Sequence, residues 1–168
     1  MRTFALIGAL VTLLFTGCAS YQMGEPTELP YRTIYVAPPQ NLSTLAKLEG
    51  PLNAALRQEI LQTSSLELAQ PGRQDATLDL TLTKAKREIA AVTTEDLGRG
   101  RKFELVLDFE LSLKRPGNNE DYFVQSREFT IKRDIFTESG LVDAEYQAGP
   151  EISREAAEKA IQIITDLW

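Results

Sequence analysis

Apolar and polar residues alternate along two stretches in the middle of the chain. From Ala76 to Thr83, leucines at every second position are separated by threonines and one aspartate, and from Phe103 to Leu113 six apolar residues occupy alternate positions over eleven residues. A period of two places the apolar side chains on one face of a β-strand. Both stretches therefore predict strands with one buried and one solvated face, and the first is predicted to run on towards Arg87.

Two further segments predict strands on either side of this pair. Residues 33–37 are a β-branched and aromatic run that ends at two prolines, which cannot donate to a sheet ladder. Residues 122–136 follow a Pro-Gly-Asn-Asn turn and predict the third strand of a meander. Phe129 and Ile131 share a face that Phe136 would leave, so we expect a bulge or bend in this strand.

Helical spacing occurs in two places. Pro51 suits the first position of a helix, where its missing N–H costs nothing, and a set of apolar residues then recurs on one face: Leu52, Ala55, Leu56 and Ile60. Ser153 is predicted to cap a second helix, with Glu155 in its first turn. The apolar face of that helix comprises Ala157, Ala160, Ile161, Ile164 and Trp168. The polar, acidic residues 137–150 are predicted to form a long loop.

The predicted order is strand, helix, three antiparallel strands, helix, with a further short strand indicated at residues 66–68. A sheet with one apolar face and two amphipathic helices bury one another most simply in two layers. The pattern therefore predicts an α+β two-layer sandwich, in which two helices pack on one face of a mixed, mainly antiparallel sheet of about four strands.

The residues before Cys18 have the three parts of a secretory signal. Arg2 supplies the positive charge, residues 4–15 the apolar core, and Thr16 and Gly17 the small residues before cleavage. The apolar run is too short for a comfortable transmembrane helix, and Cys18 is the only cysteine. This pattern predicts a lipoprotein signal peptide, 1–17, with covalent diacylglycerol and acyl lipid on Cys18. A plain secretory signal with an incidental cysteine is the alternative.

The predicted lipid would anchor a single domain to the outer membrane. Residues 18–31 contain glycine and prolines among polar groups and are expected to form the lipidated tether, which leaves 32–168 as one α+β domain. Ala19 stands where an aspartate would retain many such proteins at the inner membrane, so we expect outer-membrane sorting on the periplasmic side.

The amino-acid composition limits the catalytic and binding functions that the chain could have. The chain has no histidine, which removes Ser-His-Asp and Cys-His catalysis and the commonest zinc sites. Its formal charge of −6 makes nucleic acid an unlikely partner. Glu104, Asp108 and Glu110 alternate along one strand, and paired carboxylates can act as acid and base, but an alternating polar face accounts for them. We expect no enzymatic activity, no catalytic residue, no metal site and no cofactor.

The chain resembles the family of LptE, the lipopolysaccharide-assembly lipoprotein that partners the LptD outer-membrane barrel. The matching features are the lipobox at 15–18, the Tyr-x-x-Gly stretch at 21–24, the proline-bounded strand, the Ala-Thr-Leu-Asp-Leu strand at 76–80 and the alternating strand at 103–113. A helix follows them and ends near Trp168. The resemblance is one of pattern over nearly the whole mature chain.

The resemblance implies a plug and assembly partner of an LptD-like barrel, with lipopolysaccharide as a candidate ligand. The basic position that contacts lipopolysaccharide in the family corresponds to the loop that contains Arg99, Arg101 and Lys102, whose cations suit lipid A phosphates. A solubilising loop is the alternative interpretation. A second family lysine, before the last helix, has no counterpart, since residues 137–151 contain no basic side chain.

The sequence leaves open whether a basic stripe forms beside the Arg99 loop and which of two functions the protein has. Residues 84–87 and 132–133 would extend a basic stripe beside the Arg99 loop if those strand ends meet, although charged strand ends are commonly solvated rims. The alternative function is a periplasmic auxiliary lipoprotein of a lipid or solute transporter, or another envelope-assembly module. A barrel bound to the purified protein would favour the role in lipopolysaccharide assembly. A gene that lies beside transporter permease and ATPase genes, with no barrel bound to the protein, would favour the alternative.

Overall fold

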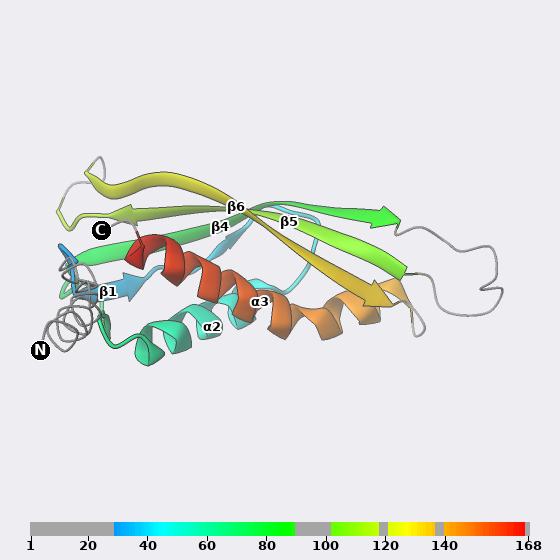
Figure 1. Cartoon of the computed structure of the whole chain (residues 1–168), viewed down its shortest axis with the longest axis horizontal. Coiled ribbons are helices and arrows are strands. Elements are labelled where there is room, and N and C mark those ends of the chain that lie inside the picture. The colour runs from blue at the N-terminus through cyan, green and yellow to red at the C-terminus, as the bar shows by residue number, and fades with distance from the viewer. Residues whose placement is uncertain (1–28, 90–101, 118–120, 137–139, 167–168) are drawn as a thin grey trace, which may run out of the picture.

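The computed structural model describes residues 29–89, 102–117, 121–136 and 140–166. A twisted sheet forms one layer and two helices cover one of its faces (Figure 1). The elements are, in chain order, β1 (Thr33–Val36), β2 (Gln40–Asn41), α2 (Glu49–Gln62), β3 (Glu67–Leu68), β4 (Ala76–Ile89), β5 (Lys102–Lys114), β6 (Tyr122–Phe136) and α3 (Leu141–Thr165). The predicted α+β class is confirmed, and the two-residue strands β2 and β3 raise the strand number in the described residues to six.

The sheet is mixed, as predicted. Its order is β3-β1-β4-β5-β6, and β2 also pairs with β4. Strands β4, β5 and β6 are antiparallel neighbours, whereas β1 runs parallel to β3 and β4. Pro38 and Pro39 separate β1 from β2 because proline has no N–H to give to the ladder.

The core lies between the apolar sheet face and the helices. Alternate residues of β4 and β5 point into it, as their period of two predicts, and Leu52, Leu56 and Ile60 of α2 meet them from the other layer. The buried residues of these two strands are Ala76, Leu78, Leu80, Leu82, Leu105, Leu107, Phe109, Leu111 and Leu113. Burial of each large aliphatic side chain contributes about 1.5–3 kcal/mol.

A bulge at Thr83 changes which side of β4 faces the helices. The register with β5 shifts between Leu82 and Lys84, and the Thr83 hydroxyl donates to the carbonyl of Asp108 at 2.9 Å. Beyond the shift, Arg87 pairs with Leu105, which faces the core. The strand continues to Ile89, as the pattern indicated, but the bulge turns an arginine towards the helix layer.

The bulge expected in β6 is present, but it lies before Arg127, whereas the register from Phe129 to Phe136, on which the expectation rested, is regular. The β5–β6 register shifts once on each side of Leu113. These shifts allow Val124 and Phe129, which have opposite parity, to be buried in the same core. Phe136 lies opposite Lys102 on the polar face and its side chain is 60% exposed.

The predicted start of the last helix is wrong. Helix α3 begins at Leu141, after Gly140 with a φ of 110°, so Ser153 is a buried residue of the helix interior and not its N-cap. Glu155 likewise lies in the middle of the helix. Residues 141–150, predicted as loop, are helical despite Pro150. The reason is packing: Leu141, Ala144, Ala148 and Ile152 continue one inward face across the proline.

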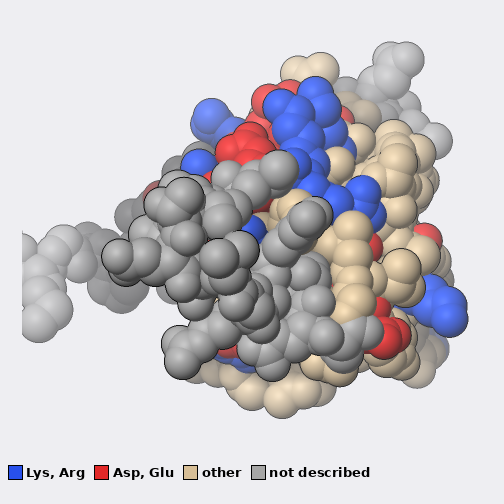
Figure 2. Space-filling model, turned by 90° about the vertical axis from the view of Figure 1, so that its right-hand side faces the viewer, with Lys and Arg blue, Asp and Glu red and all other residues tan. Residues whose placement is uncertain are grey.

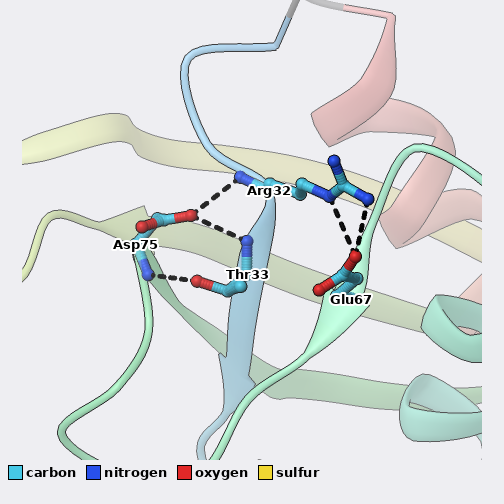
Figure 3. A network of polar contacts seen from close by, with 4 residues as sticks. All are labelled: Arg32, Thr33, Glu67 and Asp75. Atoms are coloured by element: carbon cyan, nitrogen blue, oxygen red, sulfur yellow. Dashed lines mark hydrogen bonds and ion pairs between the residues drawn. The ribbon is translucent and has the colours of Figure 1, made fainter.

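The first residues of the fold are tied to three other elements at what we call the proximal end (Figure 3). The Asp75 carboxylate accepts the backbone N–H groups of Arg32 and Thr33 at 3.0 and 2.9 Å, and Arg32 pairs with Glu67 at 2.7 Å. The backbone N–H of Thr33, followed by that of Arg32, lowers the pKa of Asp75 below its ordinary value. The buried Tyr31 hydroxyl donates to the carbonyl of Ile164 at 2.5 Å. The start of β1 is therefore fixed to β3, β4 and the end of α3.

Neither helix in the part of the chain that the structure describes is both long and apolar enough to cross a membrane.

Candidate functional site at the distal end of the sheet

The basic loop predicted to contact lipopolysaccharide leads into β5. Arg99 and Arg101 lie outside the described residues, as does Cys18, and Lys102 is the first residue of β5. Lys102 stands where β4 ends, β5 begins and β6 ends. We call this end of the sheet, on the right in Figure 1, the distal end.

Lys102 is held on the polar face but stays accessible. Its ammonium group lies 2.7 Å from a carboxylate oxygen of Asp134 and 5.9 Å from the ring centroid of Phe136. The Lys102 side chain is 43% exposed and that of Asp134 48%. An ion pair this exposed is worth little, so Lys102 can exchange its carboxylate partner for another anion at small cost.

Further lysines share this face. The register places Lys86 of β4 and Lys132 of β6 on either side of Val106, and Lys84 opposite Asp108. Figure 2 looks at this end of the molecule and shows Lys and Arg side chains gathered in its upper part, with acidic side chains beside them. The strand ends that had to meet for a basic stripe therefore do meet, and they contribute Lys84, Lys86 and Lys132.

The two arginines of the expected stripe point the other way. Arg87 and Arg133 occupy one cross-strand row with Leu105 between them, on the helix-covered face. Arg87 makes two hydrogen bonds to the carboxylate of Glu145, one of them at 3.0 Å, and Arg133 pairs with Glu151. The bond to Glu145 raises the pKa of the Arg87 guanidinium above its ordinary value, against an opposing effect of burial. These arginines join the sheet to α3.

Apolar side chains are also exposed at the distal end. Phe136, Val142 and Tyr146 have 60%, 77% and 69% of their surface exposed. Val142 and Tyr146 are four residues apart and share one side of α3. The sequence prediction missed this feature because residues 137–150 were assigned to a loop. The spacing of Leu141, Ala144 and Ala148 was the signal that could have revealed it.

The alternating carboxylates of β5 belong to the polar face. Asp108 accepts the Thr130 hydroxyl at 2.8 Å, and Glu110 accepts the Ser126 hydroxyl at 2.8 Å. Glu104 lies 3.7 Å from the ammonium group of Lys132. These contacts to β6 support the interpretation as an ordinary polar sheet face. Among the described residues no group of three or more acidic, cysteine or histidine side chains could hold a metal ion.

An open groove of about 780 Å³ runs between Pro38, Pro39 and the outer side of α2. Of the residues that line it, Glu49 and Arg57 are ionisable, and neither has a partner in the lining that would suggest acid–base chemistry. The distal end, where cations and exposed apolar groups coincide, is therefore the stronger candidate for ligand contact.

The domain has the architecture of bacterial lipoprotein structures. It is similar to the rare lipoprotein B of Shewanella oneidensis (15% identity, 80% of this chain and 95% of that chain covered, TM-score 0.51). It is also similar to a minor lipoprotein of Acinetobacter baumannii (13% identity, 81% and 94% covered, TM-score 0.52). These likenesses concern the fold. No curated protein sequence matches the chain.

The family model LptE, described as lipopolysaccharide-assembly, matches residues 31–166. The chain belongs to this family, as the sequence resemblance indicated, and its role at family level is that of an envelope lipoprotein of lipopolysaccharide assembly.

Proposed function

We propose that this protein is an outer-membrane lipoprotein that assists assembly of lipopolysaccharide at the cell surface as plug and partner of an LptD-like barrel. Acyl chains on Cys18 hold it at the periplasmic side of the membrane, and it performs no catalytic step. The observation that carries this proposal is the family match over residues 31–166.

The proposed lipopolysaccharide contact is the distal end. Lys84, Lys86, Lys102 and Lys132 present cations on the polar face, and Arg99 and Arg101 precede Lys102 in the chain. Phosphates of lipid A accept charge-assisted hydrogen bonds from such groups. The exposed Phe136, beside Lys102, offers an apolar surface next to them.

The partnership is tested by affinity capture of the full chain from outer-membrane extracts, with identification of what comes along by mass spectrometry. We expect a large outer-membrane barrel to be captured in near-equal amount. A Cys18→Ser variant is expected to remain in the membrane fraction only to the extent that the barrel retains it, because the acyl chains no longer anchor it. An extract in which the wild-type chain brings no barrel would contradict the partnership.

The ligand contact is tested by comparing two lysines of one strand. Lys102 and Lys114 begin and end β5 on the same polar face, and each is ion-paired, Lys114 with Asp79 at 2.9 Å. Lys102→Gln is expected to weaken binding of purified lipopolysaccharide about tenfold, the worth of one charged hydrogen bond, whereas Lys114→Gln leaves it unchanged. Equal effects of the two substitutions would exclude a specific distal contact.

A further inference from the structure

Helix α3 consists of two parts that are held in different ways. Residues 141–149, which we call the arm, bury Ala144, Glu145 and Gly149 and partly bury Leu141 and Ala148. Residues 152–164 place Ile152, Ile161 and Ile164 in the core. Alanine and glycine bury far less apolar surface than isoleucine, so the arm gains less from packing.

Besides the packing of Leu141, Ala144 and Ala148, the arm is held by the buried Glu145. Its carboxylate is 9% exposed and binds Arg87, whose side chain is 39% exposed. Just beyond the arm, Glu151 binds Arg133, which is 35% exposed. Both arginine side chains are thus partly accessible to solvent, and arginine binds phosphate as well as carboxylate in the same bidentate geometry.

A natural hinge separates the two parts. Pro150 has no N–H to donate to the carbonyl of Tyr146, so one helical hydrogen bond is missing there. Gly149 precedes it and adds backbone freedom. A segment with few apolar contacts and a weakened helical connection is of the kind that opens locally while the rest of a domain stays folded.

The surface beneath the arm is apolar. Leu105 lies between Arg87 and Arg133 in the same cross-strand row, and Ile135 and the partly buried Phe103 pair in the row beyond it. Glu145 and Glu151 are six residues apart, about 9 Å along a helix. The distance between β4 and β6 is similar, because two strand spacings add up to roughly 10 Å. The arm therefore covers an apolar strip that has an arginine on each side.

We propose that the arm is a latch over a concealed lipid site, which an anionic amphiphile opens. The phosphates of the amphiphile bind Arg87 and Arg133 in place of the glutamates. Its acyl chain covers the apolar strip of Phe103, Leu105 and Ile135. Loss of Arg87 leaves the Glu145 carboxylate buried without its cation, which is strongly unfavourable, so the arm leaves the sheet. The identity of the amphiphile as lipopolysaccharide rests on the proposed function. The latch itself rests on the geometry of α3.

The latch is tested by hydrogen exchange of the full chain in phosphatidylcholine nanodiscs. Glu145→Gln keeps the shape of the side chain but removes its charge. We expect amides of residues 142–149 to exchange about tenfold faster or more in this variant, with residues 152–165 unchanged. Glu158→Gln is the matched control, since Glu158 pairs with Arg154 within the same helix and is linked to the sheet only indirectly, through Arg154 and Glu151. Unchanged exchange of the arm in Glu145→Gln would overturn the latch.

Opening by lipid is tested on the wild-type chain. Lipopolysaccharide in the nanodisc is expected to speed exchange of residues 142–149 severalfold, and Pro150→Ala, which restores the missing hydrogen bond, is expected to reduce this effect. Inorganic pyrophosphate at equal phosphate concentration is expected to have much less effect, because it cannot cover the apolar strip. If pyrophosphate opens the arm as well as the lipid does, the acyl site is excluded.

Binding of lipopolysaccharide is measured on the same samples. Lipopolysaccharide that binds without any change in the arm would overturn the latch and leave the proposed function intact. A failure to bind at all would contradict the proposed ligand and, with it, opening by that ligand.

Discussion

The two ends of the domain are held together by different physical means. At the proximal end, a buried hydroxyl and backbone N–H groups fix the start of β1, and isoleucines of α3 fill the core beside them. At the distal end, α3 lies on the sheet through the partly buried Leu141, small alanines and two arginine–glutamate pairs. Apolar burial holds at any ionic strength, whereas partly exposed ion pairs can exchange partners. We therefore expect the proximal end to be rigid and the distal end to be adaptable.

The largest difference between the ends is expected from core truncation. Ile164→Ala should lower the free energy of unfolding by about 2–5 kcal/mol, because a fully buried side chain leaves a cavity. Ala148→Gly, in the arm, should cost only about 1 kcal/mol, the difference in helix propensity. Urea unfolding measures both. Equal losses would remove the distinction between the two parts of α3.

The hydrogen bond between Tyr31 and Ile164 gives the next largest effect. Tyr31→Phe keeps the ring, which packs edge-on against Phe123, but leaves the buried Ile164 carbonyl without this donor. We expect a loss of about 1–3 kcal/mol in the free energy of unfolding. A neutral substitution would show that the proximal end does not depend on this bond.

Stiffening the hinge should act in the opposite direction. A methyl group added at Gly149 meets no heavy atom within 4 Å outside its own helix. Gly149→Ala should therefore stabilise the arm by about 0.5–1 kcal/mol, seen as slower hydrogen exchange of residues 142–149. Faster exchange would mean that the glycine is needed for the closed position of the arm.

The smallest effect concerns pH at the proximal end. Because the pKa of Asp75 is lower in the folded than in the unfolded chain, its contribution is fully present above the unfolded value of about 3.9. It disappears as pH falls through the lower folded value. The stability difference between wild type and Asp75→Asn should therefore shrink in urea titrations as pH falls from about 4 towards the lower folded pKa. A difference independent of pH would assign the effect to lost shape and not to charge.

The sequence predicted best the elements whose pattern follows local geometry. The alternation from Phe103 to Leu113 specifies one strand and one buried face, and both were confirmed. The bulge at Thr83, beyond which the side chains of β4 change faces, could not be predicted, because a bulge depends on the pairing with the neighbouring strand. Because of this bulge the Arg87 side chain lies on the helix-covered face, where it pairs with Glu145 of α3.

Local signals misled the prediction where tertiary packing overrode them. Gly149 and Pro150 are ordinary helix breakers, yet packing of Leu141 and Ala144 on the sheet extends α3 across them. The candidate site was predicted in part. Lys102 was named and lies at the distal end, whereas the exposed Val142 and Tyr146 were hidden by the assumed loop.

Native-state hydrogen exchange of the unliganded wild-type chain compares the two parts of α3 within one molecule. We expect residues 142–149 to open with a free energy well below that of global unfolding and without residues 152–165, which should exchange only when the whole domain unfolds. If both parts exchange with the same opening free energy and the same dependence on denaturant, α3 is a single cooperative unit and the distal end is no more adaptable than the proximal one.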